Sequence, residues 1–463
     1  MKRTQLYPRR SFVRSTAGLA AGLAGMDVLT ACSGLGGLSA GSDSDNGELS
    51  ATVSNMPPAS DKAGLQQFKD TVAKFEKLHP KQHIVGHTYT FDPTTYYARL
   101  AAGQAEDGLL TYFTEPQFMI AHHYASDITN LIKNWQYFTS IDPNILQIVT
   151  GQDSHIYGLP VSGYALCVLY SRSLFQQAGL DPDKPPTTWE EFRGYAKQIA
   201  GKGVAGFAET STKNGGGWLF TNWMYTAGGE LEVKNGETWK AVYNSDKGVA
   251  VLNLLKAMRF TDKSMMQEQL LDADSILPFV ANKKVAMIIT SPSRLTDLKV
   301  QYQTNLDDFG LAPMPQNGGN TALAGGSIWV FNPKSKLDVI KLAYDWIIFS
   351  RFDLNVLENK YATQAKSKQP VGLPTNVIFR GAFQQQLDVL TKKYANVPLQ
   401  NYQPFVKSKL RLSAEPPVET QKMYASIDPV VQAILTVPNA DPKQLLDQAV
   451  QQFQTQVLDK VKA

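Results

Sequence analysis

Histidine, cysteine and acidic residues are the groups of this sequence that could hold a metal ion or perform acid–base chemistry. His79, His83 and His87 recur at a spacing of four, but Pro80 interrupts any helix that would bring them to one face. The sequence has no Gly-x-x-x-x-Gly-Lys-Ser/Thr phosphate loop and no His-Glu-x-x-His helix motif. We therefore expect a protein that is not an enzyme, with no catalytic residues, no metal and no cofactor.

Glu115 is the acid whose position most suggests contact with a ligand. It follows the apolar run 109–113, which predicts a short strand, and ligand groups in α/β proteins gather at the carboxyl ends of strands. The carboxylate could accept hydrogen bonds from hydroxyl groups there. The alternative is that Glu115 caps a helix that has Pro116 in its first turn.

The elements that must position such residues follow an α/β pattern. Strand-like runs at 51–55, 84–89 and 108–113 alternate with helical spacing of apolar residues at 65–78 and 96–102. A second unit begins near 163 with a strand at 166–170, and Thr188 with Glu191 forms the capping box of a later helix. The three glycines at 215–217 lack the Lys-Ser/Thr of a phosphate loop, and we expect a flexible loop there. This alternation predicts an open α/β sheet rather than a β-sandwich.

The net charge of +4 comes entirely from the N-terminus. Five of the 45 basic residues and one of the 41 acidic residues lie in positions 1–31, so the remaining 432 residues carry 40 of each sign. A neutral body argues against a nucleic-acid partner, which requires a basic face. The first 31 residues combine a basic start with a short apolar stretch, which is typical of an export signal and too short to span a bilayer permanently.

Two motifs refine the export signal. The segment RRSFVR at 9–14 resembles the twin-arginine signal, although the general export route stays open. The segment LTAC at 29–32 resembles a lipobox, which makes Cys32 the lipidated first residue of the mature protein. The Gly- and Ser-rich segment 32–50 then predicts a flexible tether. Cys167 lies in an apolar run, and we expect an inert buried thiol.

Several blocks in a fixed order resemble the extracellular solute-binding proteins of family 1, the lipoprotein receptors of ABC sugar importers. The most specific block runs from IYGLP at 156–160 to PPTTWEEF at 185–192, and another is FVANKKVAM at 279–287. Two further blocks are the Asn222-Trp223 to Gly228-Gly229 segment and FGLAPMP at 309–315, which is followed by Gly325-Gly326.

This resemblance implies the two-lobed periplasmic-binding-protein-like fold of type II, with the ligand held between α/β lobes that are joined by crossing hinge segments. The hinges would fall near 160–164, 311–315 and 370–374. Lobe 1 would comprise 51–162 plus 315–370, and lobe 2 would comprise 163–314 plus 371–463. Ligand that bridges both lobes would favour their closure, which the importer would recognise.

A sugar presents apolar C–H faces and a rim of hydroxyl groups, so its site needs aromatic rings and fixed polar groups. By resemblance to maltose-binding protein, Trp218 takes the position of an aromatic platform, although it could equally be a core residue. The helical spacing of Trp223 from Phe220 favours a core position for Trp223 over a ligand contact. The family usually has Gly-Pro-Trp where this chain has Ser291-Pro292-Ser293.

Arg294, next to that segment, would hydrogen-bond a hydroxyl or an acidic group, or would only begin a helix. Tyr164 could face the ligand or pack against the hinge, and Trp329 could be buried in a sheet. The expected ligand-binding residues are Glu115, Tyr164, Trp218, Asn222, Trp223, Ser293, Arg294, Gly325, Gly326 and Trp329.

The resulting hypothesis is an exported, lipid-anchored receptor that captures a sugar or oligosaccharide and delivers it to the permease subunits of an ABC transporter. We expect a monomer on the outer face of the cell membrane or in the periplasm. Two alternatives stay open. One is a receptor of the same fold for an anionic or nitrogenous molecule, and the other is a surface carbohydrate-active enzyme, which would need two carboxylates about 5–10 Å apart.

Overall fold

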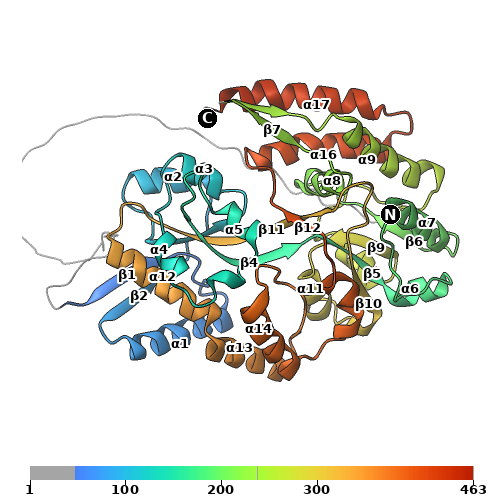
Figure 1. The fold of residues 1–463 in the computed structure, drawn as a ribbon. Coiled ribbons are helices and arrows are strands. Elements are labelled where there is room, and N and C mark those ends of the chain that lie inside the picture. Colours follow the sequence, from blue (N-terminus) through green and yellow to red (C-terminus); the bar gives the residue numbers. More distant parts are fainter. Residues whose placement is uncertain (1–46, 237, 462–463) are drawn as a thin grey trace, which may run out of the picture. The chain divides into compact units, whose positions relative to one another are not determined.

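The computed structural model describes residues 47–236 and 238–461 of the chain. The proposed export signal, Cys32 and most of the tether lie outside these residues. The described strands form two larger sheets and one hairpin, and helices pack around both sheets (Figure 1). This arrangement confirms the α/β class that the sequence predicts. Within the described residues, none of the helices is long and apolar enough to cross a membrane.

The first sheet has the strand order β12-β11-β3-β1-β2, and β4 also pairs with β11. Strand β1 is parallel to β2 and β3, whereas β11 runs antiparallel to β3 and β4. The strand β1 begins within the expected tether, two residues before the predicted position. The strands are β1 (Leu49–Val53), β2 (Gln82–Gly86), β3 (Gly108–Tyr112), β4 (Leu159–Ala165), β11 (Thr321–Phe331) and β12 (Arg411–Ser413).

Helices from the N-terminal third and from 337–394 enclose this sheet and form a first hydrophobic core with it. Phe379 and Phe383 belong to this core, although the sequence-based division assigns residues beyond 370 to lobe 2. The helices are α1 (Lys62–Leu78), α2 (Pro93–Ala101), α3 (Pro116–Ala121), α4 (Thr129–Lys133), α5 (Pro143–Ile148), α12 (Leu337–Phe352), α13 (Leu354–Lys366) and α14 (Gly381–Tyr394).

The second sheet has the order β10-β5-β9-β6 and is buried on both faces. Side chains of a strand alternate between faces, so Val168 and Tyr170 enter one core while Cys167 and Leu169 enter the other. The Cys167 thiol is fully buried and donates to the Thr290 carbonyl (3.2 Å), as expected for an inert thiol. The strands are β5 (Cys167–Ser171), β6 (Ala205–Ala208), β9 (Val285–Thr290) and β10 (Phe309–Pro313).

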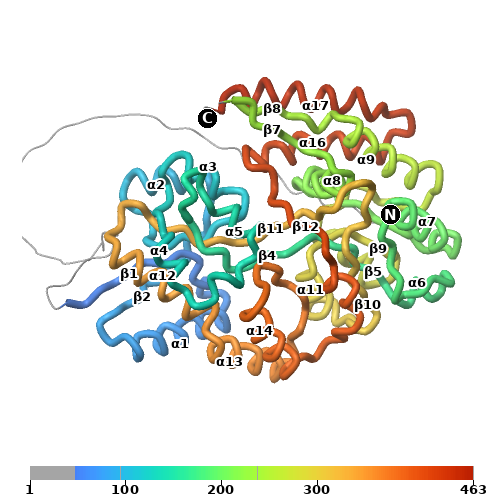
Figure 2. Tube along the Cα trace, viewed as in Figure 1, coloured from blue at the N-terminus to red at the C-terminus, as the bar shows by residue number. Residues whose placement is uncertain are grey.

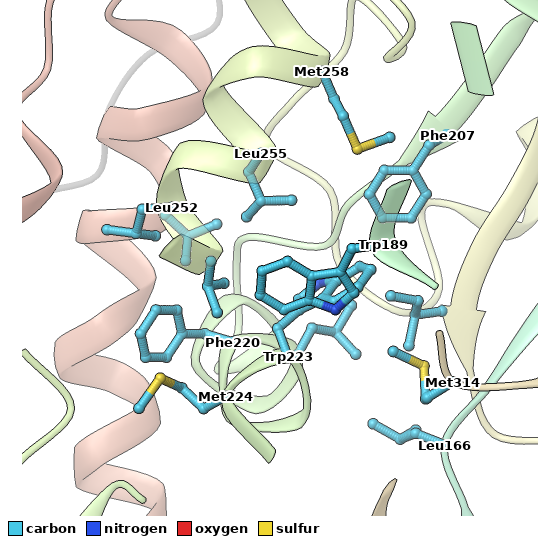
Figure 3. Close-up of a cluster of buried hydrophobic side chains, with 14 of the residues drawn as sticks. Leu166, Trp189, Phe207, Phe220, Trp223, Met224, Leu252, Leu255, Met258 and Met314 are labelled. Carbon is cyan, nitrogen blue, oxygen red and sulfur yellow. The ribbon is translucent and has the colours of Figure 1, made fainter. Parts of the chain in front are cut away.

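Helices α7, α10 and α15 contact strands of this sheet, α8, α9, α16 and α17 contact one another, and the hairpin lies beside α17. Figure 3 shows the larger core, in which Trp189 and Trp223 meet edge to face with ring centroids 5.5 Å apart. The elements are α6 (Arg172–Gln177), α7 (Trp189–Ala200), α8 (Gly215–Thr226), β7 (Glu232–Asn235), β8 (Thr238–Ala241), α9 (Asp246–Lys256), α10 (Leu277–Ala281), α11 (Arg294–Val300), α15 (Gln403–Val406), α16 (Thr420–Thr436) and α17 (Pro442–Gln456).

The chain passes from one sheet to the other at several places near the middle of Figure 2. Strand β4 of the first sheet leads through Leu166 into β5 of the second, and β10 of the second sheet leads through 314–320 into β11 of the first. A further passage at 414–419 joins β12 to α16. Beside them, the Val377 N–H donates to the Gly163 carbonyl (2.8 Å), so the segment after 370 lies against β4.

The glycine triplet at 215–217 begins a helix, so the expectation of a flexible loop is wrong. The backbone N–H groups of Asn214 and Gly217 donate to the carboxylate of Asp428 on α16, at 2.8 and 2.9 Å. Such an acceptor satisfies donors that the first turn of a helix otherwise leaves free. The cap of α8 therefore comes from a residue more than 200 positions away, which no local motif indicates. The Thr188–Glu191 capping box of α7, in contrast, is present as predicted.

Gly217 also allows the backbone of α8 to lie directly against the backbone of α16. A Cβ atom on this residue would lie 2.3 Å from the Cα of Tyr424, far inside van der Waals contact. The two helices can therefore touch through their backbones only because position 217 has no side chain.

We predict opposite effects for alanine at two helical glycines. Gly217→Ala should lower the free energy of unfolding by about 2 kcal/mol or more, because the α8 and α16 backbones must separate. Gly194→Ala on α7, where a Cβ would meet no atom within 4 Å, should raise it by about 0.5–1 kcal/mol through helix propensity. Urea unfolding of both variants measures these changes, and equal effects would contradict the proposed contact.

Glu209 follows β6 and is a buried acid that contacts Trp223 of the core in Figure 3. It is 2% exposed, and its carboxylate accepts from the Trp223 Nε1–H (3.1 Å) and the Thr210 N–H (3.1 Å). Burial raises its pKa to about 8, and the two hydrogen bonds oppose this rise only in part.

The raised pKa of Glu209 predicts a loss of stability toward alkaline pH. The folded protein keeps a proton that the unfolded chain releases above about pH 4.5, so stability should fall as the pH rises from there to about 8, by up to about 1.4 kcal/mol per pH unit. Glu209→Gln should flatten this slope in thermal unfolding between pH 5 and 8. The slope should not vanish, since Glu232 and Glu415 also have raised pKa values of about 8 and about 7.

The matched control is Glu190→Gln, at an exposed position in the first turn of α7. It should leave the pH dependence unchanged. A Glu209→Gln protein with the pH slope of the parent chain would show that Glu209 does not retain its proton in the folded state.

Candidate functional site

Glu115 lies at the carboxyl end of β3, as the sequence predicts, and takes the N-cap position of α3. Its carboxylate makes no side-chain capping bond. Instead it accepts from the Thr114 hydroxyl (3.0 Å) and from the Tyr97 hydroxyl of α2 (3.2 Å). Burial raises the pKa of Glu115, and these two hydrogen bonds oppose the rise. The carboxylate therefore points toward aromatic side chains rather than toward the helix backbone.

Tyr97, which donates to Glu115, packs against two further rings, and we call Tyr97, Phe118 and Tyr124 the Glu115 rings. The centroid of Tyr97 lies 5.2 Å from that of Phe118 and 5.0 Å from that of Tyr124. Phe118 is 39% exposed, which is unusual for a large apolar side chain at the edge of a core. The rings thus extend from the carboxylate to the protein surface.

Trp218 of α8 and Tyr164 of β4 are two expected site residues whose rings lie in contact. Trp218 is half-buried in the first turn of α8. Its ring meets that of Tyr164 from β4 edge to face, with centroids 6.3 Å apart. The Tyr164 ring lies over Gly325 of β11, where a Cβ would approach the Tyr164 hydroxyl to 2.4 Å. Gly325 therefore makes room for Tyr164.

Glu415 completes this group and is absent from the sequence-based list. It lies in the passage 414–419 and accepts from the Tyr424 hydroxyl of α16 (3.2 Å), while the Tyr225 hydroxyl of α8 donates to the adjacent Ala414 carbonyl (3.0 Å). Tyr164 also lies within the electrostatic reach of Glu415. We call Tyr164, Trp218, Tyr225 and Tyr424 the Glu415 rings.

Glu115 and Glu415 lie close enough to influence each other. Burial is the main cause that raises the pKa of Glu415 to about 7, the charge of Glu115 adds to this rise, and the Tyr424 hydrogen bond opposes it. The charge of Glu419 raises the pKa of Glu115 in turn. The charge of Glu115 thus acts on Glu415, although the two acids lie 300 positions apart in the sequence. The two acids and their rings can accept hydrogen bonds and cover apolar surface.

The sequence contains little that would single out Glu415. It precedes Pro416 and Pro417, which indicate an irregular segment but no function. It lies between β12 and α16, 300 positions after Glu115 in the chain.

The other expected site residues contact neighbouring parts of the protein itself. Trp223 is fully buried in the core of Figure 3, with its Nε1–H bonded to Glu209. Asn222 is buried and accepts from the Leu323 N–H through Oδ1 (2.9 Å), while its Nδ2 has no partner among the described residues. Trp329 is 3% exposed in β11. Gly326 faces the Phe113 ring, which a Cβ would approach to 2.6 Å.

Arg294 lies in the first turn of α11 with both of its amino groups engaged. They donate to Asp274 (2.9 Å) and to Asp297 (2.8 Å). The exposed Ser293 lies 2.7 Å from Ser291, hydroxyl to hydroxyl. These contacts correspond to the alternative in which Arg294 only begins a helix.

Two surface hollows of about 410 Å³ each lie away from Glu115 and Glu415. One is lined by Lys283, Asn305 and Asp308, and the other lies between α16 and α17. Among the described residues, no group of three or more His, Cys, Asp or Glu side chains is arranged to hold a metal ion.

The chain is similar to known proteins in sequence and in structure. A curated relative, the sn-glycerol-3-phosphate-binding periplasmic protein UgpB of Shigella dysenteriae, is 23% identical over 205 residues, which span 39% of this chain and 42% of the relative. The chain thus matches less than half the length of such relatives.

Two solved structures share the fold over almost their whole length. Maltose-bound MalE3 of T. maritima has a TM-score of 0.64 and 17% identity, covering 88% of this chain and 100% of that one. UgpB of Mycobacterium tuberculosis in complex with glycerophosphocholine has a TM-score of 0.65 and 14% identity, covering 89% and 99%. Both confirm the two-lobed type II fold. Residues 59–350 match the family model described as bacterial extracellular solute-binding protein, and the chain belongs to that family.

Proposed function

We propose that this protein captures a carbohydrate between its two lobes and delivers it to the permease of an ABC transporter. The observations that carry the proposal are the tyrosine hydroxyls that donate to Glu115 and to Glu415, and the edge-to-face contact of Trp218 with Tyr164. Rings can cover the C–H faces of a sugar, and carboxylates can accept from its hydroxyl groups. Related proteins named for maltose and for glycerol phosphate compounds support a small polar ligand.

In the proposed mechanism, the two sides of the ligand site belong to different lobes. Glu115 extends from the first sheet, whereas Trp218 and Tyr424 belong to helices that share a hydrophobic core with the second. A ligand that contacts both sides binds the closed arrangement more tightly than the open one and so shifts the protein toward it. We keep 51–162 plus 315–370 in lobe 1 and 163–314 in lobe 2, and add 376–394 to lobe 1 because Phe379 and Phe383 lie in its core.

We retain three of the expected ligand contacts, namely Glu115, Tyr164 and Trp218. We add Glu415 and Tyr424 to them. Trp223 is enclosed by the core, so we propose a structural role for it. Arg294 is held by two aspartates, which removes one of the two features of the sequence that favoured an anionic ligand; the other is Ser293, where the family usually has tryptophan. The site carboxylates would also repel an anion.

Outside the described residues, we propose that 1–31 direct export and that Cys32 receives a lipid. The protein would then be a monomer held at the outer face of the cell membrane by a flexible tether. Mass spectrometry of the membrane fraction would detect the lipid on an N-terminal Cys32.

We predict that a carbohydrate ligand raises the melting temperature of the full-length protein, since binding stabilises the folded state by mass action. A screen of mono- and oligosaccharides by thermal shift identifies the ligand, with an expected affinity near micromolar, about −8 kcal/mol. Trp218→Ala should reduce the shift to near zero, because the ring would no longer cover the sugar face. Trp239→Ala, in the β7–β8 hairpin, is the control and should keep the shift.

A normal shift in the Trp218→Ala protein would place Trp218 outside the site. If no carbohydrate changes the melting temperature while phosphate esters do, the carbohydrate proposal is wrong and an anionic ligand takes its place.

One observation bears on the enzyme alternative. Glu415 is a second acid, and the charge of Glu115 acts on it. A glycosidase needs such a pair, but the family consists of solute-binding proteins. We predict that an oligosaccharide found in the screen is recovered intact after prolonged incubation with the protein, as measured by chromatography. Hydrolysis that disappears in Glu115→Gln would establish the enzyme instead.

A further inference from the structure

Three exposed lysines and one exposed leucine lie where α1 ends and the chain turns into β2. They are Lys74, Lys77, Leu78 and Lys81, which we call the α1-end surface. Lys74, Lys77 and Leu78 are separated by helical spacings of three and four, so their side chains lie on one part of the helix surface. Leu78 is 65% exposed and is the apolar member of this group.

The lysines of the α1-end surface keep their positive charge uncompensated. Within residues 47–236 and 238–461, none of the three pairs with an acidic side chain, whereas Lys341 pairs with Asp345 and Lys393 with Glu358. Glu76, the acid of α1 nearest to them in sequence, accepts from the Ile84 N–H (3.2 Å) and faces His83. Three positive charges thus stand against one acid that is already engaged.

The described part of the chain begins at this same surface. The Leu49 N–H at the start of β1 donates to the Lys81 carbonyl (2.8 Å), and β1 and β2 run parallel from there (Figure 1). Residues 33–46, a stretch of 14 positions, separate Cys32 from the described residues. A flexible chain of that length spans about 20 Å. A bilayer that holds a lipid on Cys32 would therefore lie within reach of the α1-end surface.

The chemistry of the α1-end surface suits an anionic bilayer. Lysines near such a bilayer are attracted to its headgroups within a Debye length, about 10 Å at 0.1 M salt. An exposed leucine beside them can enter the boundary between headgroups and acyl chains. The short connection to Cys32 also gives lipid an advantage over a protein partner, because it keeps the local concentration of headgroups high.

We propose that the α1-end surface binds the anionic phospholipids of the membrane in which the Cys32 lipid is inserted. The inference goes beyond ligand capture and rests on the lipid anchor of the proposed function. It also orients the molecule, because lobe 1 then faces the bilayer and lobe 2 stays free to close over a ligand.

Fluorescent labels at two positions test this orientation in the full-length protein. Cys32→Ser removes the lipid, and Cys167 is fully buried, so a thiol-reactive NBD label attaches to an introduced cysteine. Leu78→Cys places the label in the α1-end surface. Val437→Cys, at a 48% exposed position just after α16, is the matched control. NBD emission rises when the label moves from water into lipid.

We expect vesicles of equimolar phosphatidylcholine and phosphatidylglycerol to raise the emission at position 78 about twofold or more and to leave that at position 437 nearly unchanged. The basic start of the chain brings both proteins to these vesicles, so the difference between the labels reports which face of the fold meets the lipid. Vesicles of phosphatidylcholine alone should give little change at either position.

The change of all three lysines of the α1-end surface to glutamate should lower the response at position 78 about fivefold or more, because attraction becomes repulsion. The matched control combines Lys202→Glu, Lys234→Glu and Lys240→Glu, at exposed lysines of the second half of the fold. It makes the same change in net charge and should keep the response. If the first variant does not fold, glutamine at the same three positions removes the charge and should lower the response about threefold.

No rise at position 78, an equal rise at both positions or an equal rise on neutral vesicles would overturn the inference. Failure of the anchor is seen separately, as the absence of a lipid on Cys32 in the mass spectrum. The labels then still decide whether the α1-end surface binds anionic lipid.

Discussion

The contact between α8 and α16 is the constraint on which the candidate site depends. Asp428 accepts from the backbone N–H groups that begin α8, and Gly217 lies directly against the backbone of Tyr424. This contact fixes Trp218 one residue after Gly217 and Tyr424 on the facing helix. Tyr424 in turn donates to Glu415. The position of one ring, one hydroxyl and one carboxylate therefore follows from a single close approach between two helices.

The contact between α8 and α16 also shows which helix caps local sequence patterns can predict and which they cannot. The capping box of α7 is local, with Thr188 and Glu191 three residues apart, and the pattern predicts it correctly. The cap of α8 is supplied from α16, so the glycines at 215–217 resemble a loop when only their neighbours are considered. A helix that begins with three glycines is stabilised here by tertiary contact rather than by propensity.

The strands and their faces could be predicted well because burial leaves a strong pattern in the sequence. The run at 166–170 is apolar throughout since both faces of β5 are buried, and the same reasoning places Cys167 in a core. The site could be predicted only in part. Glu115 follows a strand end and Trp218 directly follows three glycines, so both are conspicuous. Glu415 is an acid in a proline-containing segment, and only the folded chain brings it near Glu115.

The distribution of charge explains why composition alone could not suggest a ligand. Outside the first 31 residues the chain has 40 charges of each sign, which describes the molecule as a whole. Acids that pair with arginine, such as Glu106, contribute to this balance without leaving a net local charge. Within residues 47–236 and 238–461, the carboxylates of Glu115 and Glu415 accept from hydroxyl groups and pair with no cation, although the chain as a whole is neutral. Ligand selection in a neutral protein therefore depends on which charges its own fold leaves unpaired.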